Sequence, residues 1–280
     1  MSSNLILKSG IHIAGVPVTC GYPQDHSRPP LTVVFVHGMF GSSKHFEKWM
    51  VQTVEAGFNA CAIEMPSGKG TSFEDQLSDV ETVIREIRVN SKDHSIILVG
   101  HASGGLVAQA LCSRHEGLVD GLVLVASAAP QGIRQVASFW YHPRYLWASL
   151  TGKLFTLLDR HALDYVLNMY CDAEGKELLS EFKPESGRLL RDIAMGVKVG
   201  KIYHCKALIV YGAHDRMAPP EAQVELSERY DFDVFEADYG HMIPVEDNGD
   251  VFAKIRSMAI GVVCHKRRQL NRAMSGALRK

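Results

Sequence analysis

Short apolar runs alternate along this chain with segments that have the periodicity of amphipathic helices. Strands that alternate with helices in this way pair in parallel, so the pattern predicts an α/β fold with one sheet between helices. The expected strands, which are rich in β-branched and apolar residues, are 31–38, 58–66, 95–100, 121–127, 206–212 and 232–237. The expected helices are 45–57, 72–87 with Ser72 as candidate N-cap, 104–115, 220–230 and 245–259. Before them, residues 5–22 are expected to form an antiparallel hairpin.

The alternation stops over residues 131–200, which are rich in aromatic residues and have helical patterns. A segment of this length inside a compact domain is usually functional or forms a subdomain, so we expect a helical lid inserted between two core strands. The expected organisation is a core in two parts, 1–130 and 201–262, with the lid at 131–200 between them. Residues 263–280 are expected to form a basic tail, either solvated or a frayed helical end.

Composition excludes several classes of protein. The balance of 30 basic against 31 acidic residues argues against nucleic-acid binding. We expect no membrane span, because no apolar run approaches about 18 residues, and no signal peptide. The six cysteines are scattered and form no C-x-x-C pair, which favours free thiols and a cytoplasmic location. No metal-ligand spacing and no dinucleotide fingerprint occur, so neither a metal nor a cofactor is expected.

The segment LVGHASGG, residues 98–105, carries the chemistry. It has the layout of a nucleophile elbow, G-x-S-x-G, in which a sharp turn from strand to helix exposes the central residue. Small residues are needed two positions away on each side, and Gly100 and Gly104 supply them. The central position, however, is Ala102. Ser103 follows it, and we expect its side chain to point away from the reacting face while its N–H faces that side as an oxyanion donor.

Three further segments, each directly after an expected strand, match the partners that an elbow requires. HGMFGSS (37–43) would present the N–H of Met39 as the second oxyanion donor. YGAHDRMAPP (211–220) offers Asp215, and ADYGHMIPVE (237–246) offers His241. Ligand sites of open α/β sheets lie at the carboxyl ends of their strands, so these residues are expected to meet at one edge.

With these motifs the chain resembles the α/β-hydrolase family from about residue 5 to 262. The resemblance is carried by GHxxGG at 100–105, VASAAPQG at 125–132, HD at 214–215 and GH at 240–241. It implies a mostly parallel eight-stranded sheet flanked by helices. It also implies an enzyme similar to small serine esterases, lactonases and thioesterases, with alanine at the nucleophile position.

The family's triad assigns the roles. His241 would take the proton from a serine hydroxyl and return it to the leaving group, and Asp215 would fix the His241 tautomer. The substrate would be a small molecule, namely a mid-sized apolar carboxyl ester, lactone or thioester, contacted by Phe40, Trp140, Trp147 and Met242. With Ala102 in place of the nucleophile, this chain is expected to be catalytically dead.

Several explanations of Ala102 stay open. The favoured one is an inactive Ser→Ala form of a serine hydrolase. The others are a natural pseudoenzyme that only binds ligand, and a nucleophile-independent lyase or cyclase that uses His241 as general base. Hydrolysis of a C–C bond is a further alternative for the parent enzyme, because the same triad serves it within this family.

Overall fold

The computed structural model describes residues 7–23, 31–91, 94–135 and 138–277. Its centre is an eight-stranded sheet in the order β1-β2-β4-β3-β5-β6-β9-β10. The hairpin β1–β2 is antiparallel and β2 pairs antiparallel with β4, whereas all later pairs are parallel. The expected α/β fold with a mostly parallel sheet is therefore confirmed. The strands are β1 (Lys8–Ile13), β2 (Val16–Gly21), β3 (Leu31–Val36), β4 (Asn59–Ile63), β5 (Ser95–His101), β6 (Gly121–Val125), β9 (Lys206–Gly212) and β10 (Asp233–Ala237).

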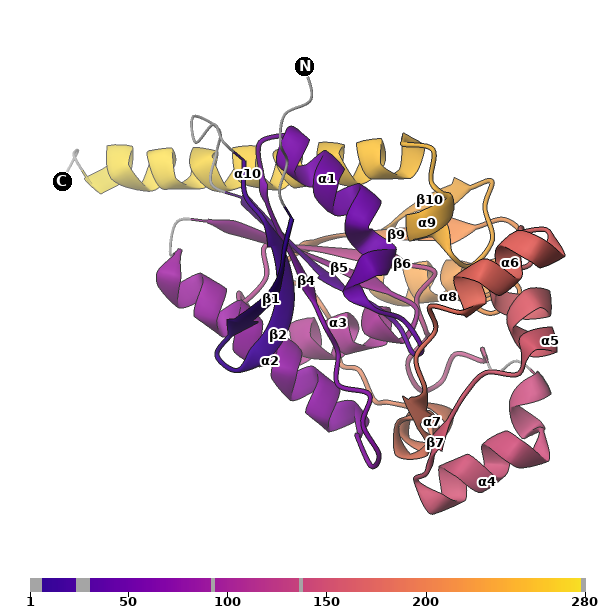
Figure 1. Ribbon diagram of the computed structural model, residues 1–280. Coiled ribbons are helices and arrows are strands. Elements are labelled where there is room, and N and C mark those ends of the chain that lie inside the picture. Colours follow the sequence, from indigo (N-terminus) through magenta and orange to yellow (C-terminus); the bar gives the residue numbers. More distant parts are fainter. Residues whose placement is uncertain (1–6, 24–30, 92–93, 136–137, 278–280) are drawn as a thin grey trace.

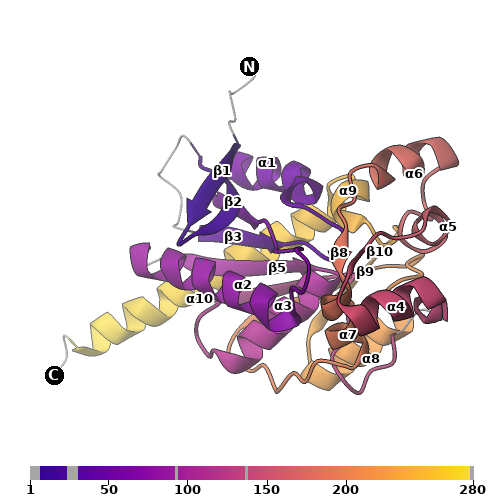
Figure 2. The same ribbon diagram turned by 60° about the horizontal axis from the view of Figure 1, so that its bottom comes forward.

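Helices cover both faces of this sheet (Figures 1 and 2). Successive residues of a strand point to opposite faces, and β3 shows the consequence, because Val34 packs with one core and Phe35 with the other. One core includes α2 (Phe73–Asn90), α3 (Ser103–Arg114) and α8 (Pro220–Tyr230). The opposite core includes α1 (Glu47–Glu55) and α10 (Asp250–Ala277).

Most of the predicted helices end within a few residues of the observed ones. Ser72 caps α2 as expected, and it forms a capping box in which Asp75 N–H donates to Ser72 Oγ and Ser72 N–H donates to Asp75. The prediction of a single helix over residues 245–259 is wrong. The chain instead forms a short α9 (Ile243–Glu246), turns through Gly249 at φ +110°, and begins α10 at Asp250.

The long helix α10 crosses the expected division at residue 263, and a helical end is one of the two forms expected for the tail. It continues without interruption to Ala277, so most of the basic segment predicted as a tail is the second half of a helix that extends past the sheet (Figure 1). Residues 278–280 lie outside the described part of the chain. Apolar residues such as Met258 and Val262 pack the first half of α10 in the core on one face of the sheet.

The segment between β6 and β9 forms helices, as expected for the lid, and we use the name lid for residues 131–200. It lies beside the carboxyl ends of the parallel strands (Figure 1). The lid has its own apolar cluster, which includes Tyr145, Phe155 and Leu167. Its elements are η2 (Ser138–Tyr141), α4 (Pro143–Thr151), β7 (Leu154–Phe155), α5 (Asp159–His161), η3 (Ala162–Val166), α6 (Asp172–Leu179), β8 (Glu185–Ser186) and α7 (Gly187–Ala194).

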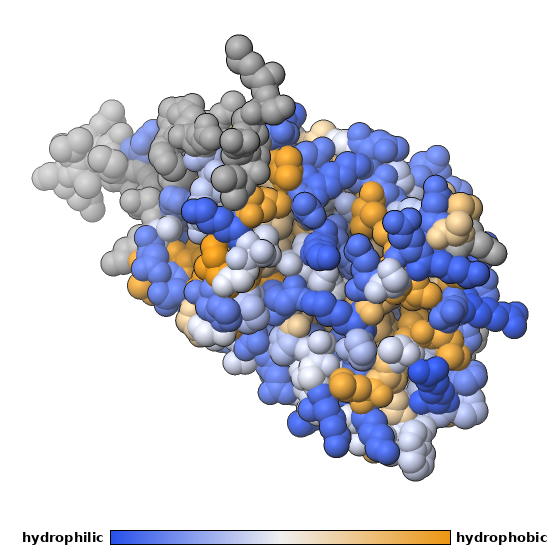
Figure 3. All heavy atoms as spheres, in the orientation of Figure 1, coloured by the Kyte–Doolittle hydropathy of each residue, from blue (hydrophilic) through white to orange (hydrophobic). Residues whose placement is uncertain are grey.

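Side chains on the outside of the lid include several large apolar ones. On α4, Tyr145 and Ala148 are buried, whereas Leu146, Trp147 and Leu150 are exposed. The face of the molecule that Figure 3 shows is mainly hydrophilic with separate hydrophobic patches, some of them on the lid side. Among the described residues, no helix combines the length and apolarity that crossing a bilayer requires.

Candidate active site

The turn between β5 and α3 has the strained geometry that the elbow motif predicts. Ala102 has φ +50° and ψ −123°, a combination that residues with a Cβ rarely adopt. The glycines on each side allow strand, turn and helix to approach. A Cβ on Gly100 would lie 2.6 Å from the Gly104 carbonyl oxygen, and a Cβ on Gly104 would lie 2.4 Å from that of Val36. Both positions therefore require glycine, and the sharp turn predicted at residue 102 is confirmed.

The two other residues expected in the triad lie in contact. Asp215 follows β9 and His241 follows β10, and His241 Nδ1 is 2.9 Å from Asp215 Oδ2. The parallel pairing of β9 with β10 carries both residues to the same edge of the sheet. Residues 26 positions apart are thus brought together as the sequence predicts.

The two expected oxyanion donors are the N–H groups of Met39 and Ser103, and the direction of the Ser103 side chain differs from the expected one. Met39 N–H donates to Ser103 Oγ at 2.8 Å. The Ser103 hydroxyl therefore lies beside residues 37–43, named the oxyanion loop for their expected role, and does not point away from the reacting face. The cause is the close approach of this loop to the start of α3, where a Cβ on Gly38 would lie 2.7 Å from Ala102 Cβ. The Met39 amide then needs an acceptor, and Ser103 Oγ supplies it.

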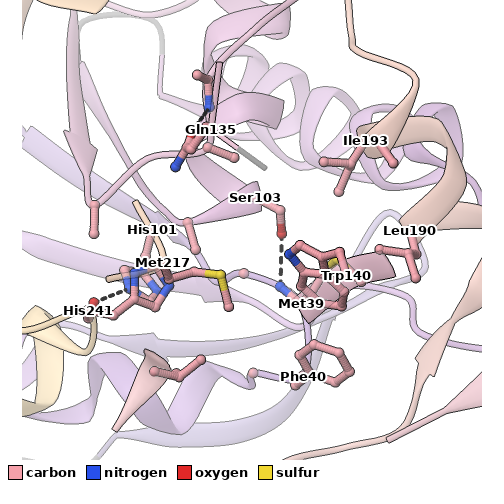
Figure 4. Close-up of a pocket in the computed structure, with 18 of the residues that line it drawn as sticks. Met39, Phe40, His101, Ser103, Gln135, Trp140, Leu190, Ile193, Met217 and His241 are labelled. Carbon is pink, nitrogen blue, oxygen red and sulfur yellow. Dashed lines mark hydrogen bonds between the residues drawn. The ribbon is translucent and has the colours of Figure 1, made fainter. Parts of the chain in front are cut away.

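A cavity of about 330 Å³ opens at this edge of the sheet. Ala102, Ser103 and His241 border it, and Asp215 lies behind His241 with a side chain that is 0% exposed. Figure 4 shows His101, His241 and Met217 on one side of the cavity and Leu190 and Ile193 on the other. Of the expected pocket residues, Phe40, Trp140 and Met242 line it, and so does Met39, the expected oxyanion donor.

Trp147 does not lie where the sequence predicts. It is 61% exposed and does not line the cavity. The helical period explains this, because Tyr145 and Ala148 occupy the inner face of α4 and leave Trp147 on the outer one. An aromatic side chain in a lid was therefore not enough to predict contact with the pocket.

Sequence reasoning missed several cavity residues, among them two from the lid helix α7 and one that follows the oxyanion loop. Leu190 and Ile193 extend from α7, and their spacing of three was the available signal for a shared helix face. His45, in the turn after the oxyanion loop, also lines the cavity. Burial lowers the pKa of His45 to about 4, so this imidazole is neutral at physiological pH.

Two other histidines near the elbow form hydrogen bonds with the backbone. His37 Nδ1–H donates to the Gly38 carbonyl at 2.8 Å, and its Nε2 accepts the Met65 N–H at 2.9 Å. His101 Nε2 lies 2.9 Å from the His241 carbonyl oxygen, so this nitrogen carries the proton and donates. Burial holds the pKa of both rings below the usual range, so neither places a positive charge beside His241.

The lid is attached to the oxyanion loop at Phe40, which has φ +63°. Lys183 N–H donates to the Phe40 carbonyl at 2.9 Å, and Phe40 N–H donates to Glu185 at 3.4 Å. The other carboxylate oxygen of Glu185 accepts the Ser186 N–H at 2.8 Å. Burial raises the pKa of Glu185 to about 7, and these two amides oppose that rise. The lid thus binds both the N–H and the carbonyl of Phe40, and so holds the backbone of the loop that carries Met39.

Within the described part of the chain, no cluster of three or more His, Cys, Asp or Glu side chains is arranged to hold a metal ion. The polar groups that the structure brings together at the site are a histidine–aspartate pair, the Ser103 hydroxyl and the N-terminus of α3.

The comparison with protein families agrees with the geometry. The profile of the Alpha/beta hydrolase family matches residues 33–255. The chain belongs to this family. It is 26% identical over 225 residues to the AB hydrolase superfamily protein YisY of Bacillus subtilis (strain 168), a match that spans 72% of this chain and 79% of that protein.

Solved structures of other hydrolases share the fold. A monoacylglycerol lipase of Paleococcus ferrophilus superposes with a TM-score of 0.66 and 20% identity, over 89% of this chain and 99% of the lipase. A soluble variant of the Saccharomyces cerevisiae monoglyceride lipase, in complex with a substrate analogue, gives a TM-score of 0.68 and 15% identity, over 93% and 96% of the two chains. These structures support the fold, and the substrates that they act on are not assigned to this chain.

Proposed function

We propose that this chain has the active site of a hydrolase for a carboxyl ester, lactone or thioester of a mid-sized apolar compound, in a form that lacks the nucleophile. The observation that carries the proposal is the strained backbone of Ala102, φ +50° and ψ −123°, beside the same cavity as His241. This conformation costs about 1–3 kcal/mol in a residue with a Cβ, and an alanine side chain gains nothing from it. A serine there would gain an exposed hydroxyl.

In the serine form, the hydroxyl at position 102 would attack the acyl carbon while His241 Nε2 takes its proton. Asp215 would stabilise the imidazolium through Nδ1–H, and the protonated His241 would then donate to the leaving group. Water would repeat the cycle on the acyl-enzyme. In the chain as it stands, Ala102 has no atom that can form the acyl bond. Loss of the nucleophile costs on the order of 10⁶-fold in a comparable triad enzyme.

The cavity supports the choice of substrate class. Its volume of about 330 Å³ lies at the lower end of the range typical of small-molecule sites, about 300–1,000 Å³. Its walls include Phe40, Trp140, Leu190 and Ile193, so the part of the substrate that they contact must be apolar. Proteins with one fold differ widely in substrate, so the activity of neither lipase is assigned to this chain.

The test is to restore the hydroxyl with Ala102→Ser and to compare both forms on a panel of aryl esters, lactones, acyl thioesters and a C–C diketone. We expect turnover only in the serine form, and its loss when His241→Ala is added. The preferred member of the panel identifies the substrate class. An Ala102→Ser protein that folds, binds apolar ligands and turns over no panel member would contradict the proposal and favour a ligand-binding protein.

A second candidate function is general-base catalysis without a nucleophile, such as a lyase or cyclase reaction. The His241–Asp215 contact favours it, because the pair stays complete although Ala102 cannot use it. This candidate predicts activity of the unaltered chain, with a dependence on pH and loss in His241→Ala. Exchange of the α-hydrogens of a ketone in deuterated water, measured by NMR, distinguishes it from the first candidate.

A further inference from the structure

At the oxyanion loop the amide of Met39 is in contact with the hydroxyl of Ser103. Met39 N–H, the donor that the motif predicts, already donates to Ser103 Oγ at 2.8 Å. Both residues border the cavity, and Figure 4 shows this hydrogen bond as a dashed line. A substrate oxygen that used the Met39 amide directly would have to displace the serine hydroxyl.

The hydroxyl is equipped to donate in place of the amide. A serine hydroxyl has one hydrogen and two lone pairs, and acceptance from Met39 uses only a lone pair. The hydrogen of Oγ stays available, and a hydroxyl that accepts from an amide becomes a stronger donor. Ser103 is 7% exposed, so it is held in place while it remains in contact with the cavity.

The backbone at the same residue adds a second donor. Ser103 is the first residue of α3, and the first amides of a helix have no acceptor within the helix. The N-terminus of a helix also carries a partial positive charge, which favours an anion. The O–H and N–H of a single residue therefore lie next to the elbow, where charge develops on the oxygen of an acyl group.

We propose that Ser103 is a catalytic residue whose hydroxyl, supported from behind by Met39 N–H, donates to the carbonyl oxygen of the substrate beside its own N–H. The inference rests on the proposed function for the identity of that oxygen. The competing view is that the hydroxyl only occupies the Met39 amide until substrate arrives. The two views predict opposite effects of Ser103→Ala, because this change removes one donor and frees the other.

The first experiment compares Ser103→Ala and Ser103→Thr, both in the Ala102→Ser background, on the best ester of the panel. We expect kcat to fall about 100-fold or more in Ser103→Ala, the loss typical of one oxyanion donor, with little change in KM. Ser103→Thr keeps a hydroxyl and is expected to retain most of the activity. An unchanged or higher kcat in Ser103→Ala would overturn the proposal, since Met39 N–H would then be the better donor.

The second experiment needs no turnover and uses the chain with Ala102. The carbonyl of 1-phenyl-1-heptanone, labelled with ¹³C, is observed by infrared difference spectroscopy when the ketone is bound. We expect its stretching frequency to lie below the value in hexane, and to rise toward that value in Ser103→Ala. A frequency that is unchanged or lower in Ser103→Ala overturns the proposal. Failure of Ala102→Ser to hydrolyse esters would refute the proposed function but would leave this infrared result informative.

Discussion

His241 and Asp215 form a pair whose geometry allows only one working orientation of the imidazole. His241 Nδ1 lies 2.9 Å from Asp215 Oδ2, and the two side chains are 6% and 0% exposed. The other oxygen, Oδ1, accepts the N–H groups of Met217 and Ala218, each at 2.8 Å. Because these amides prevent rotation of the carboxylate, the proton of His241 is held on Nδ1 and Nε2 is the nitrogen that can act as base.

Asp215→Asn should therefore disable His241 without moving it. In the Ala102→Ser background we expect kcat to fall roughly 10⁴-fold, as in a triad enzyme in which the amide imposes the wrong tautomer. Steady-state kinetics on the preferred ester measures the loss. The control is Asp238→Asn, which alters a similar contact to His214 on the surface, at 2.7 Å, and should leave kcat unchanged. Equal effects of the two changes would show that the buried pair has no special role.

The part of this site that could be predicted from sequence is the part that strand and turn geometry dictate. Gly100 and Gly104 identify the elbow because the close approach of strand and helix excludes a Cβ there. Asp215 and His241 could be placed because the carboxyl ends of parallel strands meet at one edge. These inferences need only local pattern and the order of the elements along the chain.

The rest depends on contacts between distant segments, which carry no local signal. The hydrogen bond from Met39 to Ser103 joins residues 64 positions apart, and it reverses the expected direction of the Ser103 side chain. The outward position of Trp147 follows from which face of α4 meets the rest of the lid. The break before α10 arises at Asp247, whose side chain accepts from Trp49 in another part of the chain.

Glu185 predicts a specific dependence of stability on pH. Its pKa is raised from the usual 4.5 to about 7, so the folded protein keeps this proton in a range where the unfolded chain loses it. The stabilisation of the folded state by this retained proton is complete below pH 4.5 and is lost as pH rises through 7. The total change in unfolding free energy is roughly 3 kcal/mol. Glu185→Gln removes this titration. Urea titrations at pH 5 and pH 8 give the unfolding free energy of the variant and of the parent. Relative to the parent, the variant should be more stable at pH 8 than it is at pH 5. A difference that is the same at both pH values would contradict the assignment.

Asp247 should be a strong determinant of stability away from the site. Its carboxylate is fully buried and accepts the indole N–H of Trp49 at 2.8 Å, together with the N–H groups of Gly249, Val251 and Phe252 at the start of α10. Asp247→Ala leaves these donors without an acceptor, and we expect a loss of about 2–4 kcal/mol in urea unfolding. The exposed neighbour provides the control, because Asn248→Ala should change stability by less than about 0.5 kcal/mol. Comparable losses in both variants would refute this role.

The apolar wall of the cavity predicts which lid residue controls ligand binding. Ile193 lines the cavity, whereas Leu150 is 75% exposed on the outer side of α4. Ile193→Glu places a charge against the apolar part of the ligand, and we expect binding of 1-phenyl-1-heptanone to weaken at least about 10-fold by calorimetry. Leu150→Glu introduces the same charge outside the cavity and should bind like the parent. A loss in Leu150→Glu that matches the loss in Ile193→Glu would exclude the cavity as the binding site.

The most direct test of a nucleophile site at residue 102 is covalent labelling of the Ala102→Ser protein with a fluorophosphonate, followed by intact mass measurement. Labelling requires a hydroxyl in the elbow, His241 as base and the oxyanion donors, but it requires no knowledge of the substrate. We predict addition of one phosphonyl group to the serine form, none to the chain with Ala102, and none when His241→Ala is added to the serine form. Absence of labelling in a folded Ala102→Ser protein would contradict the account, because the cavity would then hold a histidine–aspartate pair that cannot activate a serine at this position.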